Sequence, residues 1–285
     1  MTDGRAWSKR LTGGAARAGL VGLVGRDLNA PVLAGLADGL QHGIGEDRRV
    51  VLLAGSHGGG GRLGEVLESF WSLPVEGVVV LGAVDRPDDV SRLARRGLPV
   101  VVVGDCVHTP NVACVGLDFE MVARVPVDHL AGSGLRRIGM IGPPVRSAGG
   151  SPTERGFLAA VEAAGVEGAI VRAEATIEGG GAALRDLIER FSGVDGVVAH
   201  NDLMATGAIR GAADLGIRVP AQMAVVSADD MGLGELVVPA LTSVRPIHEQ
   251  LVEAVATALD RLIEEPGLSP EPVAVPVELV VRESA

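Results

Sequence analysis

The sequence contains few cysteines and few aromatic residues. Cys106 and Cys114 are the only cysteines among 285 residues, and two thiols are too few for a disulfide framework or a cysteine-based metal site. The two could meet if neighbouring loops fold back, but we expect reduced thiols. Aromatic residues make up 2% of the chain and tyrosine is absent, so few rings are available to stack against a bound ligand.

The chain also lacks an excess of positive charge and a long hydrophobic run. Its formal net charge is -11, whereas a domain that neutralises phosphates carries a basic patch, so we do not expect the body of the chain to bind nucleic acid. Basic residues cluster in residues 1–18. The apolar stretch over residues 19–25 is too short for a secretory signal, and no run approaches membrane-spanning length. We expect a cytoplasmic protein without a membrane partner.

Short continuous runs of aliphatic residues recur along the chain, with helical patterns between them. They lie at residues 20–24, 50–53, 78–81 and 100–103 in the first half, and at 137–142, 169–171, 196–199 and 223–227 in the second. Because these runs do not alternate with polar residues, both faces of each strand should be covered by helices, as in a parallel sheet. A chain of this length exceeds one compact domain. The sequence therefore predicts an α/β protein with two doubly wound parallel-sheet lobes.

Several helix signals lie between these runs. Asp118 is expected to cap a helix that begins at Phe119, and residues 151–154 read Ser-Pro-Thr-Glu, which matches a capping box with proline in the first turn. Pro126 would cost about 3 kcal/mol inside a helix, so we expect a kink or a late helix start there. The apolar spacing over residues 251–262 predicts an amphipathic helix.

Polar residues directly follow two of the predicted strands. His200, Asn201 and Asp202 follow the run at 196–199, and Asp229 and Asp230 follow the run that ends at Ser227. In open α/β sheets ligands bind outside the carboxyl ends of the strands, and a carboxylate accepts hydrogen bonds from two hydroxyl groups at once. We expect a small-molecule site there, with Asp229 contacting the ligand and Asp230 capping a short helix near Gly232.

Other candidate sites have weaker support. His57 precedes four glycines, but the lysine and serine or threonine of a phosphate-binding loop are absent, which favours a flexible loop. The six histidines are scattered without helical pairing, and no Gly-x-Ser-x-Gly motif occurs. We therefore expect neither a metal, a cofactor nor an enzyme. A lone histidine is rarely catalytic, so we expect a structural role for His129. His200 lies at the carboxyl end of a strand, and a functional and a structural role remain equally open for it.

A series of residue phrases extends from about Gly19 to Arg282 in a specific order and spacing. The phrases include residues 75–80, 97–101, 136–139, 156–160, 201–205, 239–245 and 276–282. Each is weak alone. Together they resemble the LacI-type bacterial transcriptional regulators, whose effector-binding core is similar to periplasmic sugar-binding proteins.

This resemblance implies a particular division of the chain. Residues 1–18 would be a basic tail or hinge-helix remnant, residues 19–135 plus 241–265 the N-terminal lobe, and residues 136–240 plus 266–285 the C-terminal lobe. A ligand cleft would lie between the lobes, and their closure would reorient the two subunits of a homodimer. Such a mechanism requires an effector that favours one arrangement energetically.

The resemblance also implies an effector-binding site. Its hydrogen-bonding residues would be Asn201, Asp229 and Asp118, its lining residues Asp27 and Thr153, and His200 would tune its polarity. The effector would be a sugar or a related polar metabolite. The alternative is a solute-binding protein of a sugar transport system, which would carry an export signal or a lipoprotein cysteine; we find neither.

The sequence departs from the family pattern in two regions. Only 18 residues precede the first strand, so we expect the helix-turn-helix headpiece to be absent or truncated and operator DNA to be bound only if a headpiece is present. Leu11 matches the leucine that enters the DNA minor groove, although a disordered tail is the alternative. In the pocket, Val32 and Leu33 replace an aromatic platform, and Thr153 replaces an arginine for which Arg146 is a possible substitute.

Overall fold

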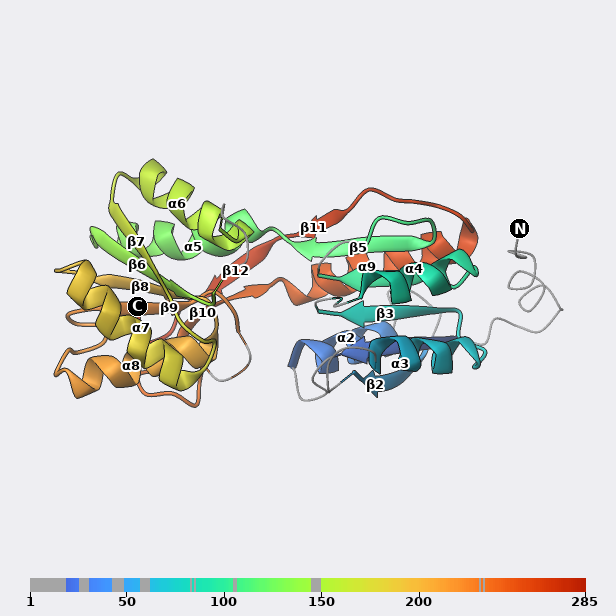
Figure 1. The fold of residues 1–285 in the computed structure, drawn as a ribbon, viewed down its shortest axis with the longest axis horizontal. Coiled ribbons are helices and arrows are strands. Elements are labelled where there is room, and N and C mark those ends of the chain that lie inside the picture. Colours follow the sequence, from blue (N-terminus) through green and yellow to red (C-terminus); the bar gives the residue numbers. More distant parts are fainter. Residues whose placement is uncertain are drawn as a thin grey trace. The chain divides into compact units, whose positions relative to one another are not determined.

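The computed structural model describes residues 19–25, 31–42, 49–56, 62–82, 84, 86–104, 107–144, 150–230, 232 and 234–285. The chain forms two units (Figure 1). The first contains the described residues up to Leu117 together with Ile247–Val275, and the second contains Asp118–Pro246 and Pro276–Ala285. The predicted pair of α/β units is confirmed.

The first unit is built on a six-stranded sheet. Its strands are β1 (Leu20–Gly25), β2 (Val50–Gly55), β3 (Gly77–Leu81), β4 (Val100–Val103), β5 (Val112–Leu117) and β11 (Val273–Val275), in the order β11-β5-β4-β3-β1-β2. All neighbouring strands are parallel. Its helices are α2 (Pro31–His42), α3 (Arg62–Trp71), α4 (Pro87–Arg95) and α9 (His248–Glu264).

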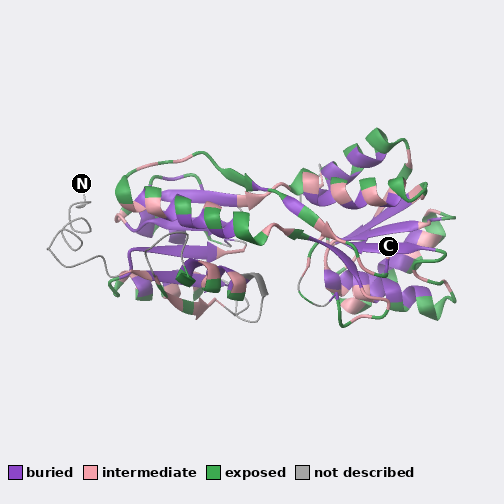
Figure 2. Cartoon of the chain, turned by 180° about the vertical axis from the view of Figure 1, so that it is seen from behind, coloured by how far each residue is buried: buried purple, intermediate pink, exposed green. Residues whose placement is uncertain are grey.

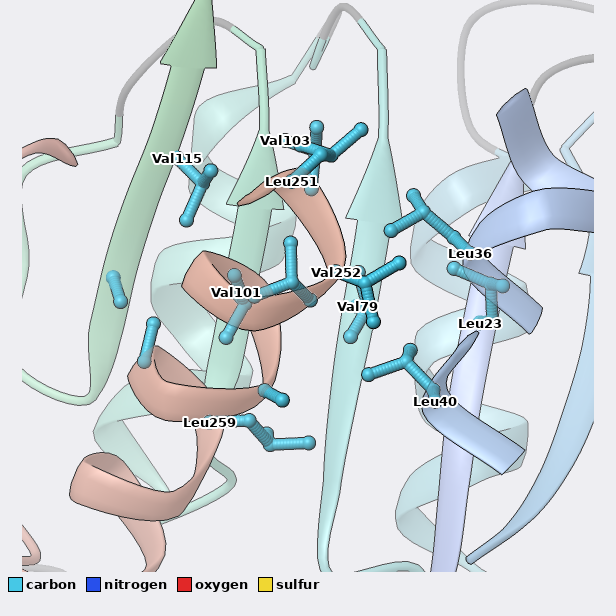
Figure 3. Packing of buried hydrophobic residues seen from close by; sticks show 14 of the residues in the cluster. Leu23, Leu36, Leu40, Val79, Val101, Val103, Val115, Leu251, Val252 and Leu259 are labelled. Carbon is cyan, nitrogen blue, oxygen red and sulfur yellow. The ribbon is translucent and has the colours of Figure 1, made fainter. Parts of the chain in front are cut away.

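Helices cover both faces of this sheet, which explains why its strands are continuously aliphatic. On one face, α2 and α9 pack against alternate strand residues, and Figure 3 shows Leu251, Val252 and Leu259 of α9 beside Val79 and Val101. On the other face, α3 and α4 pack against the intervening strand residues. The predicted amphipathic helix is thus confirmed as α9, with its apolar residues buried.

The second unit repeats this architecture. Its strands are β6 (Arg137–Gly142), β7 (Glu167–Arg172), β8 (Gly196–Ala199), β9 (Ala224–Ser227), β10 (Thr242–Pro246) and β12 (Val277–Val280), in the order β12-β10-β9-β8-β6-β7. Only β12 runs antiparallel to its neighbour. Its helices are α5 (Phe119–Gly132), α6 (Pro152–Ala164), α7 (Ile177–Arg190) and α8 (Asp202–Asp214).

The core of the second unit again lies on both faces of the sheet. Helices α5 and α6 pack against Met140, Val198 and Val226, and helices α7 and α8 pack against Val197 and Val225 on the opposite face. In Figure 2 the central strands of both units are largely buried, while the outer faces of the helices are exposed. None of the helices in the described ranges is both long and apolar enough to cross a membrane.

The observed unit boundaries differ from those inferred from sequence at three places. Helix α5 and strand β10 belong to the second unit, because α5 packs on the second sheet and β10 pairs with β9. Strand β11 belongs to the first unit, since it pairs with β5. As the family resemblance implied, α9 lies in the first unit and β12 in the second.

Two local expectations need correction. Helix α5 begins at Phe119 and continues through Pro126 to Gly132, which excludes the late start, one of the two alternatives expected from the proline. Cys114, a buried residue of β5, is disulfide-bonded and is not the reduced thiol that we expected. Cys106, the other cysteine of the sequence, lies outside the described residues.

Candidate functional site

The carboxyl edge of the second sheet gathers the polar residues that the sequence singled out. Strands β7, β6, β8 and β9 are parallel neighbours in register, so their carboxyl ends meet at the same edge. Arg172 ends β7, His200 follows β8, and Asp229 follows β9 after one residue. Helix α5 begins near the start of α6, where the backbone of Glu120 leaves no room for a side chain at Gly156. Asp118 therefore lies near the start of α6.

Asn201 is the N-cap of α8. Its Oδ1 atom accepts a hydrogen bond of 3.0 Å from the Met204 backbone N–H, which satisfies one of the free donors at a helix start. Its Nδ2 group has no hydrogen bond with the described residues, so two donors are left for a ligand. Asp202 is the first residue of α8 and is fully buried.

Asp229 has an unusual protonation equilibrium. Asp229 as a whole residue is exposed to solvent. The surrounding protein nevertheless partly desolvates its carboxylate, and this desolvation raises the pKa of Asp229 to about 6. The negative charges of Asp202 and Asp230 also raise it, whereas the hydrogen bond of 2.9 Å from the Asp230 backbone N–H lowers it. Asp229 thus exchanges a proton near neutral pH and can either accept or donate a hydrogen bond.

Asp230 has a different role from the one expected. It forms an ion pair with Arg282 at 3.3 Å between Oδ2 and Nη2, and its Oδ1 accepts a hydrogen bond from the Gly232 backbone N–H. Arg282 also donates to the Leu241 carbonyl oxygen. No helix begins beside Asp230 in the described part of this loop, so the expected helix cap is wrong. The ion pair instead ties the loop to the C-terminal segment.

Asp118 and Thr153 occupy helix starts. The Oδ1 atom of Asp118 accepts hydrogen bonds from the backbone N–H groups of Glu120 and Met121, at 3.1 and 3.0 Å, which confirms the predicted cap. Its Oδ2 atom has no hydrogen bond with the described residues. Thr153 is buried in the first turn of α6, and the predicted capping box between Ser151 and Glu154 is present.

Sequence reasoning missed an ion pair at this edge. Glu154 is 3% exposed, and its carboxylate accepts hydrogen bonds from Arg172 at 2.8 and 3.1 Å. Desolvation alone would raise the pKa of Glu154, but the hydrogen bonds from Arg172 and from the Ser151 backbone outweigh it and the pKa is lowered. The capping motif identified Glu154, but no sequence signal connects this helix residue with Arg172 at the end of β7.

His200 lies within electrostatic range of this pair. Desolvation lowers the pKa of His200, and the negative charge of Glu154 only partly offsets the effect. The imidazole is therefore neutral at neutral pH and offers one donor and one acceptor. Neither ring nitrogen hydrogen-bonds to a described residue. The described residues contain no group of histidine, cysteine, aspartate and glutamate side chains that could hold a metal ion.

Sequence comparisons show which known proteins the chain resembles. A model described as a periplasmic binding protein-like domain matches residues 127–285. An HTH-type transcriptional regulator from Streptomyces limosus, from the aml 5′ region, is 33% identical over 279 residues, which cover 94% of this chain and 79% of the relative. The HTH-type regulator MalR of Streptomyces coelicolor is 32% identical and aligns over 93% of this chain and 80% of its own.

Solved structures agree with the sequence comparison. A LacI-family regulator from Sanguibacter keddieii is 29% identical with a TM-score of 0.75, covering 94% of this chain and 99% of its own. The regulator CelR in complex with cellobiose is also 29% identical with a TM-score of 0.75, covering 99% of this chain and 89% of its own. The chain belongs to the LacI family of transcriptional regulators.

Membership in the LacI family decides between the two functions that the sequence left open. The chain is the effector-binding core of a LacI-type regulator and not a solute-binding protein of a transport system, because the relatives reported above are transcriptional regulators.

Not every residue that the family pattern indicated can be placed. The structure brings His200, Asn201 and Asp229 to the carboxyl edge. Asp27, Leu11 and Arg146 lie outside the described residues, as does the glycine run after His57. Leu33, expected at the position of an aromatic platform, is buried in the core of the first unit.

Proposed function

We propose that this LacI-family core binds an uncharged, hydroxyl-rich effector, a sugar or a related polar metabolite, at the carboxyl edge of the second sheet. The observation that carries the proposal is the hydrogen-bonding capacity left at this edge. Within the described part of the chain, Asn201 retains both Nδ2 donors and Asp118 retains Oδ2, and Asp229 can donate or accept. Hydroxyl groups both donate and accept, and so match such a set.

Charge at the edge supports an uncharged effector. Arg172 is paired with Glu154, and Arg282 is paired with Asp230. Neither guanidinium is thus an uncompensated positive charge that would favour an anionic ligand. The relative CelR was solved in complex with cellobiose, which also favours a carbohydrate.

Thermal unfolding with a panel of ribose, glucose and cellobiose tests this proposal. A ligand that binds only the folded state stabilises it, by about 2.7 kcal/mol at a ligand concentration 100 times the Kd. This stabilisation raises the melting temperature. At least one sugar should raise the melting temperature of the unaltered chain, and Asp229→Ala should abolish the rise. The control Asp128→Asn changes an exposed carboxylate on α5 and should retain it. A panel without effect would contradict the proposal.

We also propose that two copies of the chain associate through the second unit. Leu236 and Val238 are 79% and 88% exposed, and Val238 borders a hollow of about 340 Å³ that is also lined by Ile209, Ile217 and Pro239. Exposed aliphatic residues beside an apolar hollow are typical of a protein interface. The occupant would be the same patch of a second copy, as in an isologous dimer.

The oligomeric state tests this interface. Light scattering coupled to size exclusion should show a dimer for the unaltered chain and a monomer for the double variant Leu236→Glu, Val238→Glu, because buried carboxylates oppose association. Leu158→Glu places the same charge at an exposed leucine of α6 and should leave the dimer intact. A dimer that survives the double substitution would exclude this surface.

We further propose that the core controls DNA binding through a helix-turn-helix headpiece, in the cytoplasm and without catalysing a reaction. The relatives named as HTH-type regulators support this role. Effector binding would act by favouring one arrangement of the core, which the headpiece then reports to the operator. With the headpiece joined to the core, the effector should change operator affinity in a gel-shift titration. An unchanged affinity at saturating effector would contradict the coupling.

A further inference from the structure

Glu154 is a buried carboxylate whose orientation is fixed from two sides. Its residue is 3% exposed, and its oxygens accept hydrogen bonds from Arg172 Nε and Nη2 and from the Ser151 backbone N–H. A buried carboxylate is stable only when it is paired and hydrogen-bonded. The capping box of α6 and the last residue of β7 together satisfy this requirement, and neither would do so alone.

The pairing fixes Arg172 without using all of its donors. Two parallel N–H···O bonds to one carboxylate set the plane of the guanidinium. They use Nε and Nη2, and the Nη1 group has no hydrogen bond with any described residue. The Arg172 side chain is 44% exposed. Oriented donors without an acceptor among the described residues therefore remain at the carboxyl end of β7, two strands from His200.

The proposed effector site thereby gains a second group of polar side chains. We propose that Arg172 contacts the effector through its unpaired N–H groups, that Glu154 is the positioning residue for Arg172, and that both act with His200 to select hydroxylated effectors over anionic ones. This inference rests on the proposed function, since it adds residues to the same site.

The charge of this group determines the class of ligand. The charges of Glu154 and Arg172 cancel, and His200 is neutral because desolvation lowers its pKa. The group therefore presents donors and one acceptor without net charge, which suits hydroxyl oxygens. A carboxylate on the effector would approach the negative charges of Asp202 and Asp229 and would be repelled.

The central experiment uses the sugar among ribose, glucose and cellobiose that raises the melting temperature most. Its Kd is measured by titration calorimetry for the unaltered chain and for Arg172→Lys. Lysine keeps a positive charge beside Glu154 but lacks the planar fork, so the fold should survive while the Kd rises at least tenfold. The matched control is Arg245→Lys, which alters a half-exposed ion pair with Glu278 in the same sheet and should leave the Kd unchanged.

Two further measurements protect the test against misfolding and against a purely structural role. The double variant Glu154→Gln, Arg172→Gln removes both charges together, leaves no unpaired buried ion, and should also bind at least tenfold more weakly. Glu154→Gln alone should lower the pKa of His200 in an NMR titration. In the unaltered chain the Glu154 carboxylate opposes the effect of desolvation on His200, and the variant lacks this charge. An unchanged His200 titration would show that Glu154 does not act on His200 and would overturn the proposal that the two act together.

The last measurement compares the binding of a neutral sugar with that of its acid. The same sugar with its primary hydroxyl oxidised to a carboxylate should bind the unaltered chain at least tenfold more weakly, and tighter binding of the acid would overturn the selectivity. If a sugar binds the unaltered chain and Arg172→Lys equally well, only this inference fails. If none of the three sugars binds the unaltered chain, the proposed effector class fails and this inference fails with it.

Discussion

At the residue scale, Asp229 combines exposure to solvent with a pKa raised to about 6, mainly by desolvation. The folded chain therefore retains a proton between about pH 4 and pH 6, where the unfolded chain has already lost it. Stability contributed by this proton is present at low pH and is lost as pH rises through that window. A residue that costs stability in this way at neutral pH is typical of a binding site.

Replacing Asp229 with asparagine should remove this pH-dependent cost. Two pH units correspond to roughly 3 kcal/mol, but solvent screens the exposed carboxylate, so we expect a gain of about 1 kcal/mol at pH 7.5. The gain should shrink towards zero as pH falls to about 4. Urea unfolding of both proteins across this range measures the difference. A difference that does not vary with pH would show that the Asp229 pKa is not raised.

At the element scale, several site residues also hold helices in place. Asn201 caps α8 and is proposed to contact the effector, whereas Thr176 caps α7 through its hydroxyl and the Gly179 N–H. A cap contributes about 1 kcal/mol. The two contributions of Asn201 can be separated, because serine also caps a helix but has no amide donors.

Asn201→Ser should leave stability within a few tenths of a kcal/mol and reduce the rise in melting temperature caused by the effector. Thr176→Ala should show the reverse, a loss of about 1 kcal/mol with the effector response retained. Thermal unfolding with and without the sugar that binds the unaltered chain measures both quantities. Equal effector responses in Asn201→Ser and the unaltered chain would mean that Asn201 serves only as a cap.

The contact between α7 and α8 depends on glycine. A Cβ atom at Gly207 would overlap the Ile177 carbonyl oxygen, and Gly180 faces the backbone of Met204 in the same way. Gly207→Ala should therefore destabilise the chain by at least 1 kcal/mol, although alanine is the better helix former. Gly132→Ala at the exposed end of α5, where a Cβ meets nothing, should be neutral or stabilising. Denaturant unfolding of the two variants gives the comparison, and equal effects would argue against a tight helix contact.

The elements that sequence predicted correctly are those whose physical cause is local. The aliphatic runs become β1, β3, β4 and β8 because helices cover both sheet faces, and Asp118 and Ser151 cap helices through neighbours two or three residues away. The Glu154–Arg172 pair was not predicted, because the two residues are 18 positions apart in sequence and meet only when α6 packs on β7. Asp230 was misassigned for the same reason, since its partner Arg282 is distant in sequence.

At the scale of the whole molecule, neither unit is continuous in sequence. The chain passes between the units after Leu117, after Pro246 and after Val275. The first unit is therefore completed by α9, which follows the main part of the second unit and supplies apolar residues to one face of the first sheet. Contacts between segments so far apart close a long loop, which costs more conformational entropy than a local contact does.

Leu259→Ala tests, within the intact chain, how far the first unit depends on α9. Leu259 is fully buried on α9, and its truncation should cost about 2 to 5 kcal/mol of unfolding free energy through lost contacts and a cavity. The loss should be confined to the unit that α9 covers. Hydrogen exchange should therefore accelerate in β3 and β4 of the first sheet, while β6 and β8 of the second keep their protection. Equal acceleration in both sheets would show that the two units unfold as one and that α9 stabilises the molecule as a whole.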